Sequence, residues 1–312
     1  MPDSTTTTAS RSKGTSRGFH FLNEYQVCPW RFYLHYVLGL EPVHQGKALL
    51  FGTAVHAAKE AFYKDMQLGV QTSTADFVSA GVLSLASQKD LYERRDDFDT
   101  DAKRLGPMLA AWHSKWAAHD LDTYEVLAVE EEIKFPLPGG FSMTVRPDAI
   151  LQVRMTNPQH IVALETKSTS KSVGAMQKSV ACSGQVDAQL LGLRSLGFTD
   201  PDFAVDVLPD ILYQRQNGPI LAERPCLLGR SKRELAEAAL GFSGIASEIA
   251  QKCAAIEAPD AEVPPEFYFP RNGLVCGQFG CAYETICKAR TRPGDVPCGF
   301  LHAEASDASI EV

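Results

Sequence analysis

The stretches "RPDAILQV" (residues 146–153) and "VALETKST" (residues 162–169) place three ionisable side chains in β-type sequence. Residues two apart on a strand point to the same face, so Glu165 and Lys167 project together with their backbones roughly 7 Å apart. Asp148 opens the neighbouring strand-like segment, and the proline before it indicates a bulge or a strand end. We therefore expect three charged groups to converge at one point of a sheet.

This set of residue types has a definite chemistry. Two carboxylates with few other donors are typical of a Mg²⁺ or Mn²⁺ site. Such a metal stabilises a phosphoryl oxygen and lowers the pKa of a bound water, and a nearby lysine orients that water and stabilises charge on the phosphate. The pattern indicates phosphodiester hydrolysis. A Glu-x-Lys pair is also common on solvent-facing strands as a weak salt bridge, and this alternative stays open on the residues alone.

The bulk composition narrows the class of protein. The chain of 312 residues is 45% hydrophobic and 22% charged, which is ordinary for a soluble globular protein of one or two domains. A formal charge of −8 argues against a generally basic protein that coats nucleic acid, but allows a nucleic-acid enzyme with one positive groove. "MPDSTTTTASRSKGTSRG" (residues 1–18) has no apolar core of a secretory signal, so we expect a disordered tail and a cytoplasmic protein.

Hydrophobic periodicity orders the elements along the chain. Ahead of the sheet, residues 19–40 are expected to form two short helical turns, with Pro29 at a first helical position and Gly39 at the stop. Two further helices are expected at residues 53–66, with Thr53 as the N-cap, and at residues 105–116. Residues 91–104 are expected to be a solvated connection. The expected later elements are a hairpin of residues 124–135 and 141–153 across "PLPGG", a strand at 160–168, a helix at 174–197, strands near 206–216 and 223–229, and a helix from a Ser231–Glu234 capping box to about Pro259. These predict an α/β fold: a mixed β-sheet core flanked by helices, with an N-terminal helical lobe and a Cys-rich C-terminal segment.

Pro147-Asp148, followed by Glu165-Thr166-Lys167, resembles the signature of the PD-(D/E)XK nuclease superfamily, and within it the RecB-like group. The resemblance implies a restriction-endonuclease-like fold. It also implies that Asp148 and Glu165 bind Mg²⁺ or Mn²⁺, that the main-chain carbonyl of Thr166 is a further ligand, and that Lys167 is the catalytic lysine.

Two helical motifs extend the resemblance. "LLFGTAVHAAKEAFY" (residues 49–63) is similar to the first motif of the group, which implies that His56 reaches the metal; Glu60, one turn on, reads better as a solvated glutamate. Gln185 matches the glutamine of the group, which implies a role in the catalytic site. The group usually has a tyrosine four residues later, where this chain has Gln189, so the effect of that departure on activity stays open.

Four of the eight cysteines have the spacing of a metal site. Cys276, Cys281 and Cys287 lie within twelve residues, and Cys28 is a candidate fourth thiol in a reduced compartment. Zinc sites usually carry Cys-x-x-Cys pairs, and the wider spacings here suit an iron–sulfur cluster better, with zinc or unligated thiols as alternatives. We interpret the other four as packing residues: Cys182, Cys226, Cys253 and Cys298.

The sequence is similar here to AddB-type and CRISPR-associated RecB-like nucleases, which have one cysteine before the nuclease core and three after it. The resemblance implies a four-iron, four-sulfur cluster on Cys28, Cys276, Cys281 and Cys287. The gap between Cys276 and Cys281 departs from the usual Cys-x-x-Cys of those nucleases. Because the ligands join the two ends of the chain, we expect a structural staple without redox turnover.

The resemblance covers residues 20–290 and implies the following division: a tail (1–17), an N-terminal helical lobe with the first cluster cysteine and His56 (18–122), the nuclease core (123–260), an iron–sulfur segment (261–302) and a tail (303–312). It implies a metal-dependent DNA nuclease, an exonuclease or end-processing enzyme of recombination, repair or a mobile element. The expected substrate is DNA, single-stranded or with free ends. The sequence has no Gly-rich phosphate loop, so a helicase or recombination partner would be a separate chain, and no membrane is involved. Two alternatives remain: an inactive nuclease-fold protein that binds DNA or a partner enzyme, and a zinc-stapled interaction protein.

Overall fold

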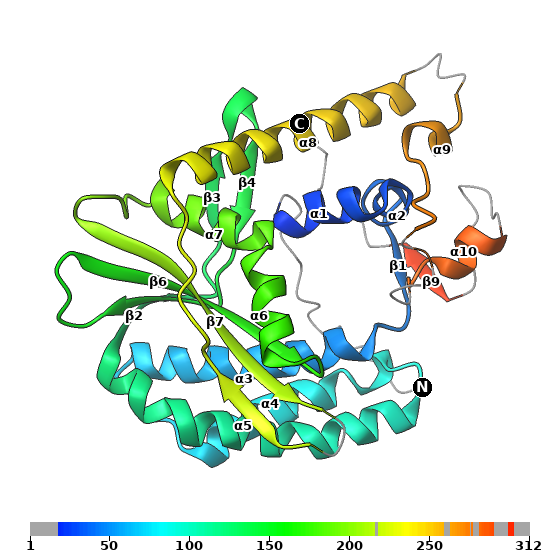
Figure 1. Cartoon of the computed structure of the whole chain (residues 1–312). Coiled ribbons are helices and arrows are strands. Elements are labelled where there is room, and N and C mark those ends of the chain that lie inside the picture. The colour runs from blue at the N-terminus through cyan, green and yellow to red at the C-terminus, as the bar shows by residue number, and fades with distance from the viewer. Residues whose placement is uncertain are drawn as a thin grey trace, which may run out of the picture.

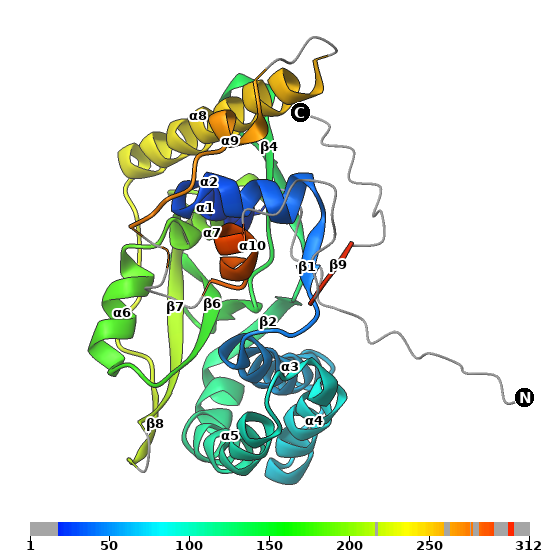
Figure 2. The same cartoon turned by 90° about the vertical axis from the view of Figure 1, so that its right-hand side faces the viewer.

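The structure is a computed structural model, and it describes residues 18–215, 218–258, 263–274, 276, 281–289 and 299–302. A sheet lies between a lobe of helices on one side and a second group of helices on the other (Figure 1), and the turned view separates these layers (Figure 2). The predicted α/β class, with a mixed sheet flanked by helices, is confirmed. Over the described ranges, no helix is both long enough and apolar enough to cross a membrane.

The helical lobe is formed by α3 (Lys47–Gln67), α4 (Thr74–Ser87) and α5 (Arg95–Thr123). Its interior is aromatic: the rings of Phe62 and Phe77 both pack against the ring of Trp112, and all three side chains are buried. Burying rings of this size contributes strongly to the hydrophobic free energy of folding. This packing of α4 and α5 against α3 holds α3 in place against the sheet.

Two expected boundaries in this lobe are wrong. α3 begins at Lys47, and Thr53 lies inside it, where its hydroxyl donates to a carbonyl one turn earlier. Residues 91–104 are mostly helical, because α5 begins at Arg95. One side of this charged helical segment faces the protein interior. Asp101 is buried there and accepts a hydrogen bond from the hydroxyl of the buried Tyr92. α4 was not among the expected helices.

The N-terminal helical turns are as expected. They are α1 (Phe19–Val27), α2 (Pro29–Phe32) and a π-helical turn (Tyr33–Val37), followed by β1 (Leu40–Pro42). Pro29 occupies the first position of α2, and Gly39 has a φ of 63°, the left-handed conformation that ends helices. β1 pairs antiparallel with β9 (Phe300–His302), which ties the N-terminal segment to the C-terminal segment.

The central sheet has the order β2-β5-β6-β7-β8. The strands are β2 (Tyr124–Val129), β5 (Ala149–Val153), β6 (Gln159–Thr169), β7 (Phe203–Gln214) and β8 (Ile220–Glu223). β6 and β7 run parallel, and the other neighbours are antiparallel, so the sheet is mixed. The strand expected near residues 223–229 is displaced: β8 ends at Glu223, and Leu228 forms an isolated bridge with Val207.

The two β-type stretches at residues 124–135 and 141–153 each break into two strands. Their inner ends, β3 (Ile133–Pro136) and β4 (Ser142–Val145), form the expected hairpin across a 3₁₀ turn at Pro138–Gly140. Their outer ends are β2 and β5, which pair in the central sheet. The breaks fall at Glu130, which has a φ of 50°, and at Pro147 before Asp148. The strand end expected at Pro147 is therefore confirmed, and it leaves Asp148 outside the ladder.

The second group of helices comprises α6 (Val173–Ala181), α7 (Gly184–Ser195), α8 (Lys232–Glu257), and the short α9 (Pro265–Tyr268) and α10 (Glu284–Ala289). The single helix expected at residues 174–197 is two helices, because Ser183 caps a new one by accepting from the main-chain N–H of Gln185 at 3.1 Å. The capping box of Ser231 and Glu234 is confirmed.

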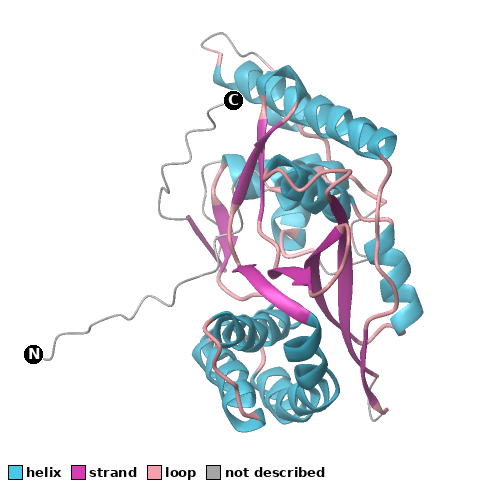
Figure 3. Ribbon diagram, turned by 90° about the vertical axis from the view of Figure 1, so that its left-hand side faces the viewer, coloured by secondary structure: helices cyan, strands magenta, loops and turns pink. Residues whose placement is uncertain are grey.

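Different helices cover the two faces of the sheet (Figure 3). On β6, Val162 and Leu164 belong to the core shared with the helical lobe. Ala163 belongs to the core shared with α6 and α7. Alternation along the strand therefore directs Glu165 and Lys167 toward α7 and the residue between them toward α3.

The cysteines interpreted as packing residues differ from one another. Cys253 is buried on α8, as expected. Cys182 and Cys226 are exposed, so the packing interpretation is wrong for both. Cys182 is the C-cap of α6, directly before Ser183, the N-cap of α7. Cys298 lies outside the described residues.

Candidate active site

Asp148 is held where α3 meets the ends of two strands. Its Oδ2 accepts a hydrogen bond from the main-chain N–H of Thr166 at 2.6 Å, and its Oδ1 lies 2.9 Å from Nδ1 of His56. The first contact follows from the pairing of β5 with β6, and the second from the packing of α3 on the sheet. The structure thus brings together Asp148, His56 and the strand that carries Glu165 and Lys167.

Glu165 is buried, and both of its carboxylate oxygens have partners. Oε1 forms an ion pair with Nζ of Lys167. Oε2 accepts from Nε2 of Gln185 at 2.9 Å and from Nε2 of Gln189 at 2.5 Å. The Gln185 carbonyl oxygen also accepts from Lys167 at 3.3 Å. Both glutamines of α7 therefore face the acid–lysine pair, including the one that stands where a tyrosine is usual.

The electrostatics of the site favour charged side chains. Burial alone would raise the pKa of Asp148, but the charge and hydrogen bond of His56 and the N–H of Thr166 outweigh it and lower the pKa to about 2. Burial would lower the pKa of Lys167, but the charge and hydrogen bond of Glu165 outweigh it and raise the pKa. Lys167 is therefore a cation near neutral pH, which suits stabilisation of negative charge rather than proton abstraction.

Glu130 is a site residue that the sequence interpretation missed. Ligand atoms of His56, Glu130 and Asp148 lie within 4.8 Å of one another. Burial, and after it the charge of Asp148, raise the pKa of Glu130 to about 7. Its only sequence signal is a run of three glutamates after β2, of which Glu131 and Glu132 are exposed.

A buried charge network supports α3 behind the site. Nζ of Lys59 lies 2.7 Å from Oδ2 of Asp210 and 3.4 Å from the Thr166 hydroxyl, while Arg224 and Trp112 also donate to Asp210. The Lys59 and Asp210 side chains are almost fully buried. Each charge has a counterion and hydrogen bonds, the condition under which buried ions are tolerated. The network joins α3 and α5 to β7 beneath Thr166.

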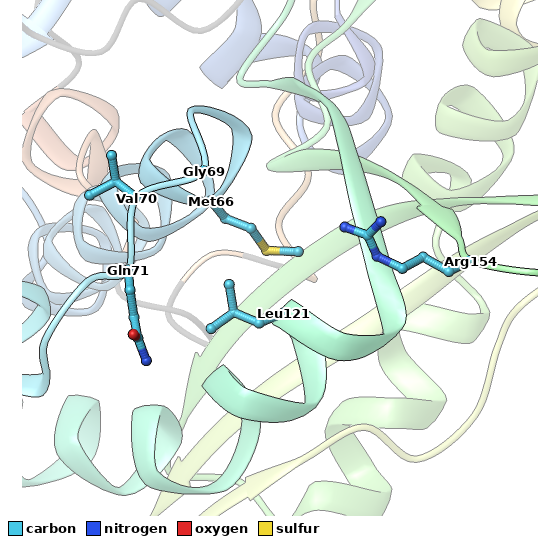
Figure 4. A pocket seen from close by; sticks show the side chains of 6 residues that line it. All are labelled: Met66, Gly69, Val70, Gln71, Leu121 and Arg154. Atoms are coloured by element: carbon cyan, nitrogen blue, oxygen red, sulfur yellow. The ribbon is translucent and has the colours of Figure 1, made fainter.

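Glu60 is on the solvent side of α3. It pairs with Lys64 at 2.6 Å and its side chain is 37% exposed, in agreement with the solvated interpretation. At the far end of the same helix, a pocket of about 340 Å³ is lined by Met66, Gly69, Val70, Gln71, Leu121 and Arg154 (Figure 4). It contains none of the predicted site residues and no carboxylate or histidine. The chemistry of this protein is therefore not expected there.

The four cluster cysteines belong to one neighbourhood. Cys28, Cys281 and Cys287 contact the same hydrophobic cluster. The pKa of the Cys287 thiol is raised to about 11, mainly by burial and in smaller part by the thiols of Cys281, Cys276 and Cys28, against the charge of Arg271. In the described part of the chain, no three of these sulfur atoms come within 4.8 Å of one another.

The donor set at the sheet fits a divalent metal. His56 offers a nitrogen, and Asp148 and Glu130 offer carboxylate oxygens, the ligand types of Mn²⁺ and Mg²⁺ sites. Glu165 is not part of this close group, because its oxygens face Lys167, Gln185 and Gln189. A mixed sheet with histidine, aspartate, glutamate and lysine side chains at its strand ends is consistent with the fold of metal-dependent nucleases.

Comparison with known families agrees with this class. The family model of the PD-(D/E)XK nuclease superfamily matches residues 20–288, and the chain belongs to that superfamily. No curated protein sequence matches the chain. Members of the superfamily are usually metal-dependent nucleases, so the family indicates a nuclease, a divalent metal and a nucleic-acid substrate.

Proposed function

We propose that this chain is a divalent-metal-dependent deoxyribonuclease of the RecB-like group that hydrolyses phosphodiester bonds as an exonuclease or end-processing enzyme. The observation that carries the proposal is the ion pair of Lys167 with the buried Glu165, beside an Asp148 carboxylate held from two sides. A binding module gains nothing from burying a carboxylate against a lysine next to a second carboxylate, because each buried charge costs desolvation energy.

The residues divide the work as follows. His56, Asp148, Glu165 and the Thr166 carbonyl would hold the metal, which when bound supplies positive charge at the phosphoryl oxygen and a more acidic water. Asp148 is oriented for this by the N–H of Thr166 and by His56. Lys167 is protonated beside Glu165 and stabilises the negative charge that develops on the phosphate.

Gln185 acts between the two halves of the acid–lysine pair. Its amide donates to Glu165 and its carbonyl accepts from Lys167, so one side chain fixes the spacing of both. The substrate we propose is DNA, single-stranded or with free ends, in recombination, repair or a mobile element. A separate helicase or recombination partner would supply unwinding.

The test is cleavage of end-labelled single- and double-stranded DNA by anaerobically purified protein with Mg²⁺ or Mn²⁺. We expect cleavage that EDTA and Lys167→Ala abolish. Lys171→Ala is the matched control, because Lys171 is an exposed lysine four residues further along the chain, and it should cleave like the wild type. The product ladder then reports whether cutting starts from an end. No cleavage by folded wild-type protein would favour the inactive DNA-binding alternative.

We further propose that Cys28, Cys276, Cys281 and Cys287 bind a four-iron, four-sulfur cluster that staples residues 261–302 to the N-terminal lobe. The shared electrostatic neighbourhood of these thiols supports a common ligand. The spacing of Cys276, Cys281 and Cys287 along the chain, without a Cys-x-x-Cys pair, also favours a cluster over a single zinc ion.

Iron and acid-labile sulfide content, with the visible absorption spectrum, test the cluster. Cys281→Ala should lose iron and lower the thermal unfolding midpoint. Cys226→Ala, an exposed cysteine outside the set, should retain both. Stoichiometric zinc without iron would instead support the zinc-stapled alternative.

A further inference from the structure

We propose that Glu130, at the end of β2, is an additional protein ligand of the divalent metal, on the His56 side of Asp148. The inference rests on the proposed metal dependence and adds a residue that the superfamily signature in this chain does not contain. Ligand atoms of Glu130, His56 and Asp148 all lie within 4.8 Å of one another. In an octahedral site with bonds of about 2.1 Å, ligand atoms lie about 3.0 Å apart when adjacent and about 4.2 Å apart when opposite. A small contraction would bring the three residues onto one ion.

The backbone delivers Glu130 to this place. The main-chain N–H of Glu130 donates to the carbonyl of Asp148 at 3.2 Å, which continues the β2–β5 pairing by one residue beyond the strand end. The pairing shifts register between Val126 and Ala128, so β2 is bulged just before this point. Bulges re-aim side chains at the ends of strands. Glu130 then adopts a φ of 50°, a left-handed conformation that is uncommon for glutamate.

A simple ion pair does not account for the position. Oε2 of Glu130 lies 3.1 Å from Nε of Arg146, so one oxygen has a counterion. A partly exposed pair of this kind contributes little free energy and would form equally well with the carboxylate turned to solvent. Instead the carboxylate lies beside that of Asp148, where like charges repel. A divalent cation shared between them removes that repulsion.

The neighbours of Glu130 provide the contrast. Glu131 and Glu132 have the same side chain in the same connection between β2 and β3, and both are exposed. Only Glu130 of the three has ligand atoms close to His56 and Asp148. Glu165, by comparison, is held from the α7 side by Gln185 and Gln189. The metal would thus have one carboxylate ligand on each side of Asp148: Glu130 at the end of β2 and Glu165 on β6.

The experiment is calorimetric titration of Mn²⁺ into the full-length protein, without DNA, for the wild type and three variants. Glu130→Gln removes the charge and weakens the ligand, and we expect Mn²⁺ affinity to fall at least tenfold. Glu130→Asp keeps the charge but shortens the side chain, and we expect a similar loss. Glu131→Gln is the matched control, with the same change of charge one residue away, and should bind like the wild type. The thermal unfolding midpoint in EDTA verifies that each variant is folded.

The outcomes separate this inference from the proposed function. Wild-type affinity in Glu130→Gln overturns the ligand role and leaves the nuclease proposal intact. Wild-type affinity in Glu130→Asp, with weak binding in Glu130→Gln, also overturns it, because charge attraction alone then explains the effect. If the wild type binds no Mn²⁺ at all, both the ligand role and the metal dependence fail. Loss in both Glu130 variants with an unchanged Glu131→Gln supports the inference.

Discussion

Nε2 of Gln189 donates a hydrogen bond of 2.5 Å to Oε2 of Glu165, across the interface of α7 with β6. Gln189 is only 2% exposed, and its own carbonyl oxygen is buried without a hydrogen-bond partner in the described structure. A glutamine that leaves one polar atom unpaired is a poor choice for stability alone. We therefore propose that Gln189 positions Glu165, at the place where the RecB-like group usually has a tyrosine.

Gln189→Leu should lower DNA cleavage by about tenfold, because partners of metal ligands typically tune activity by that order. The free energy of unfolding should stay the same or rise, since the unpaired carbonyl is removed. Cleavage rates and urea unfolding of the same preparations measure both. Gln177→Leu, a change of the same kind on α6, serves as the control and should cleave at the wild-type rate. Unchanged cleavage in Gln189→Leu would remove the positioning role.

The buried network behind the site predicts a large loss of stability on truncation. Asp210→Ala leaves the charges of Lys59 and Arg224 buried without their shared counterion. Breaking a buried pair in this way costs about 3–5 kcal/mol of unfolding free energy. Glu237→Ala removes an exposed ion pair with Arg233 on α8 and should cost less than about 0.5 kcal/mol. Urea unfolding compares the two, and similar small losses would contradict the role assigned to the network.

Two glycines in helices should respond to alanine with opposite signs. A Cβ added to Gly81 of α4 would lie 2.5 Å from Cδ1 of Leu109 and 3.1 Å from the carbonyl oxygen of Ala54. Gly81→Ala should therefore destabilise the protein by about 1–3 kcal/mol through overpacking. A Cβ on Gly241 of α8 would meet nothing within 4 Å, so Gly241→Ala should stabilise by up to about 1 kcal/mol through helix propensity. Thermal unfolding midpoints that move in the same direction would refute this packing account.

The cysteines outside the cluster set should differ in alkylation. Burial raises the pKa of Cys253 to about 11, with a further contribution from Glu257. At pH 8 about one Cys253 thiol in a thousand would then be a thiolate, and it is also shielded from reagent. Cys182 and Cys226 are exposed and should react with iodoacetamide first. Peptide mass spectrometry after a short exposure measures the order, and early labelling of Cys253 would count against its burial.

The convergence of Asp148, Glu165 and Lys167 could be predicted because it depends on local rules. Alternation on a strand puts Glu165 and Lys167 on one face, and a proline ends the preceding strand next to Asp148. The mixed sheet followed from the same periodicity. Residues close together in the sequence determine these features, so local sequence patterns are enough to predict them.

Other features depend on contacts between distant residues and could not be predicted. The burial of Lys59 requires Asp210 and Arg224, which arrive from β7 and from the segment after β8. Of three adjacent glutamates, only Glu130 lies close to His56 and Asp148. Its position depends on a bulge in β2 and on its own left-handed φ, and neither can be predicted from the residue types. The split between α6 and α7 is different, because its signal is local: Ser183 is a recognisable N-cap inside a longer apolar pattern.

The most direct measurement of the central claim is cleavage and DNA binding, side by side, for the wild type and Asp148→Asn. The amide keeps an oxygen for the N–H of Thr166 but loses the charge proposed to hold the metal. We expect both proteins to bind DNA, and Asp148→Asn to cleave at least about 100-fold more slowly with Mn²⁺. Equal cleavage by the two, or DNA binding without any cleavage by the wild type, would contradict a catalytic centre at Asp148, Glu165 and Lys167.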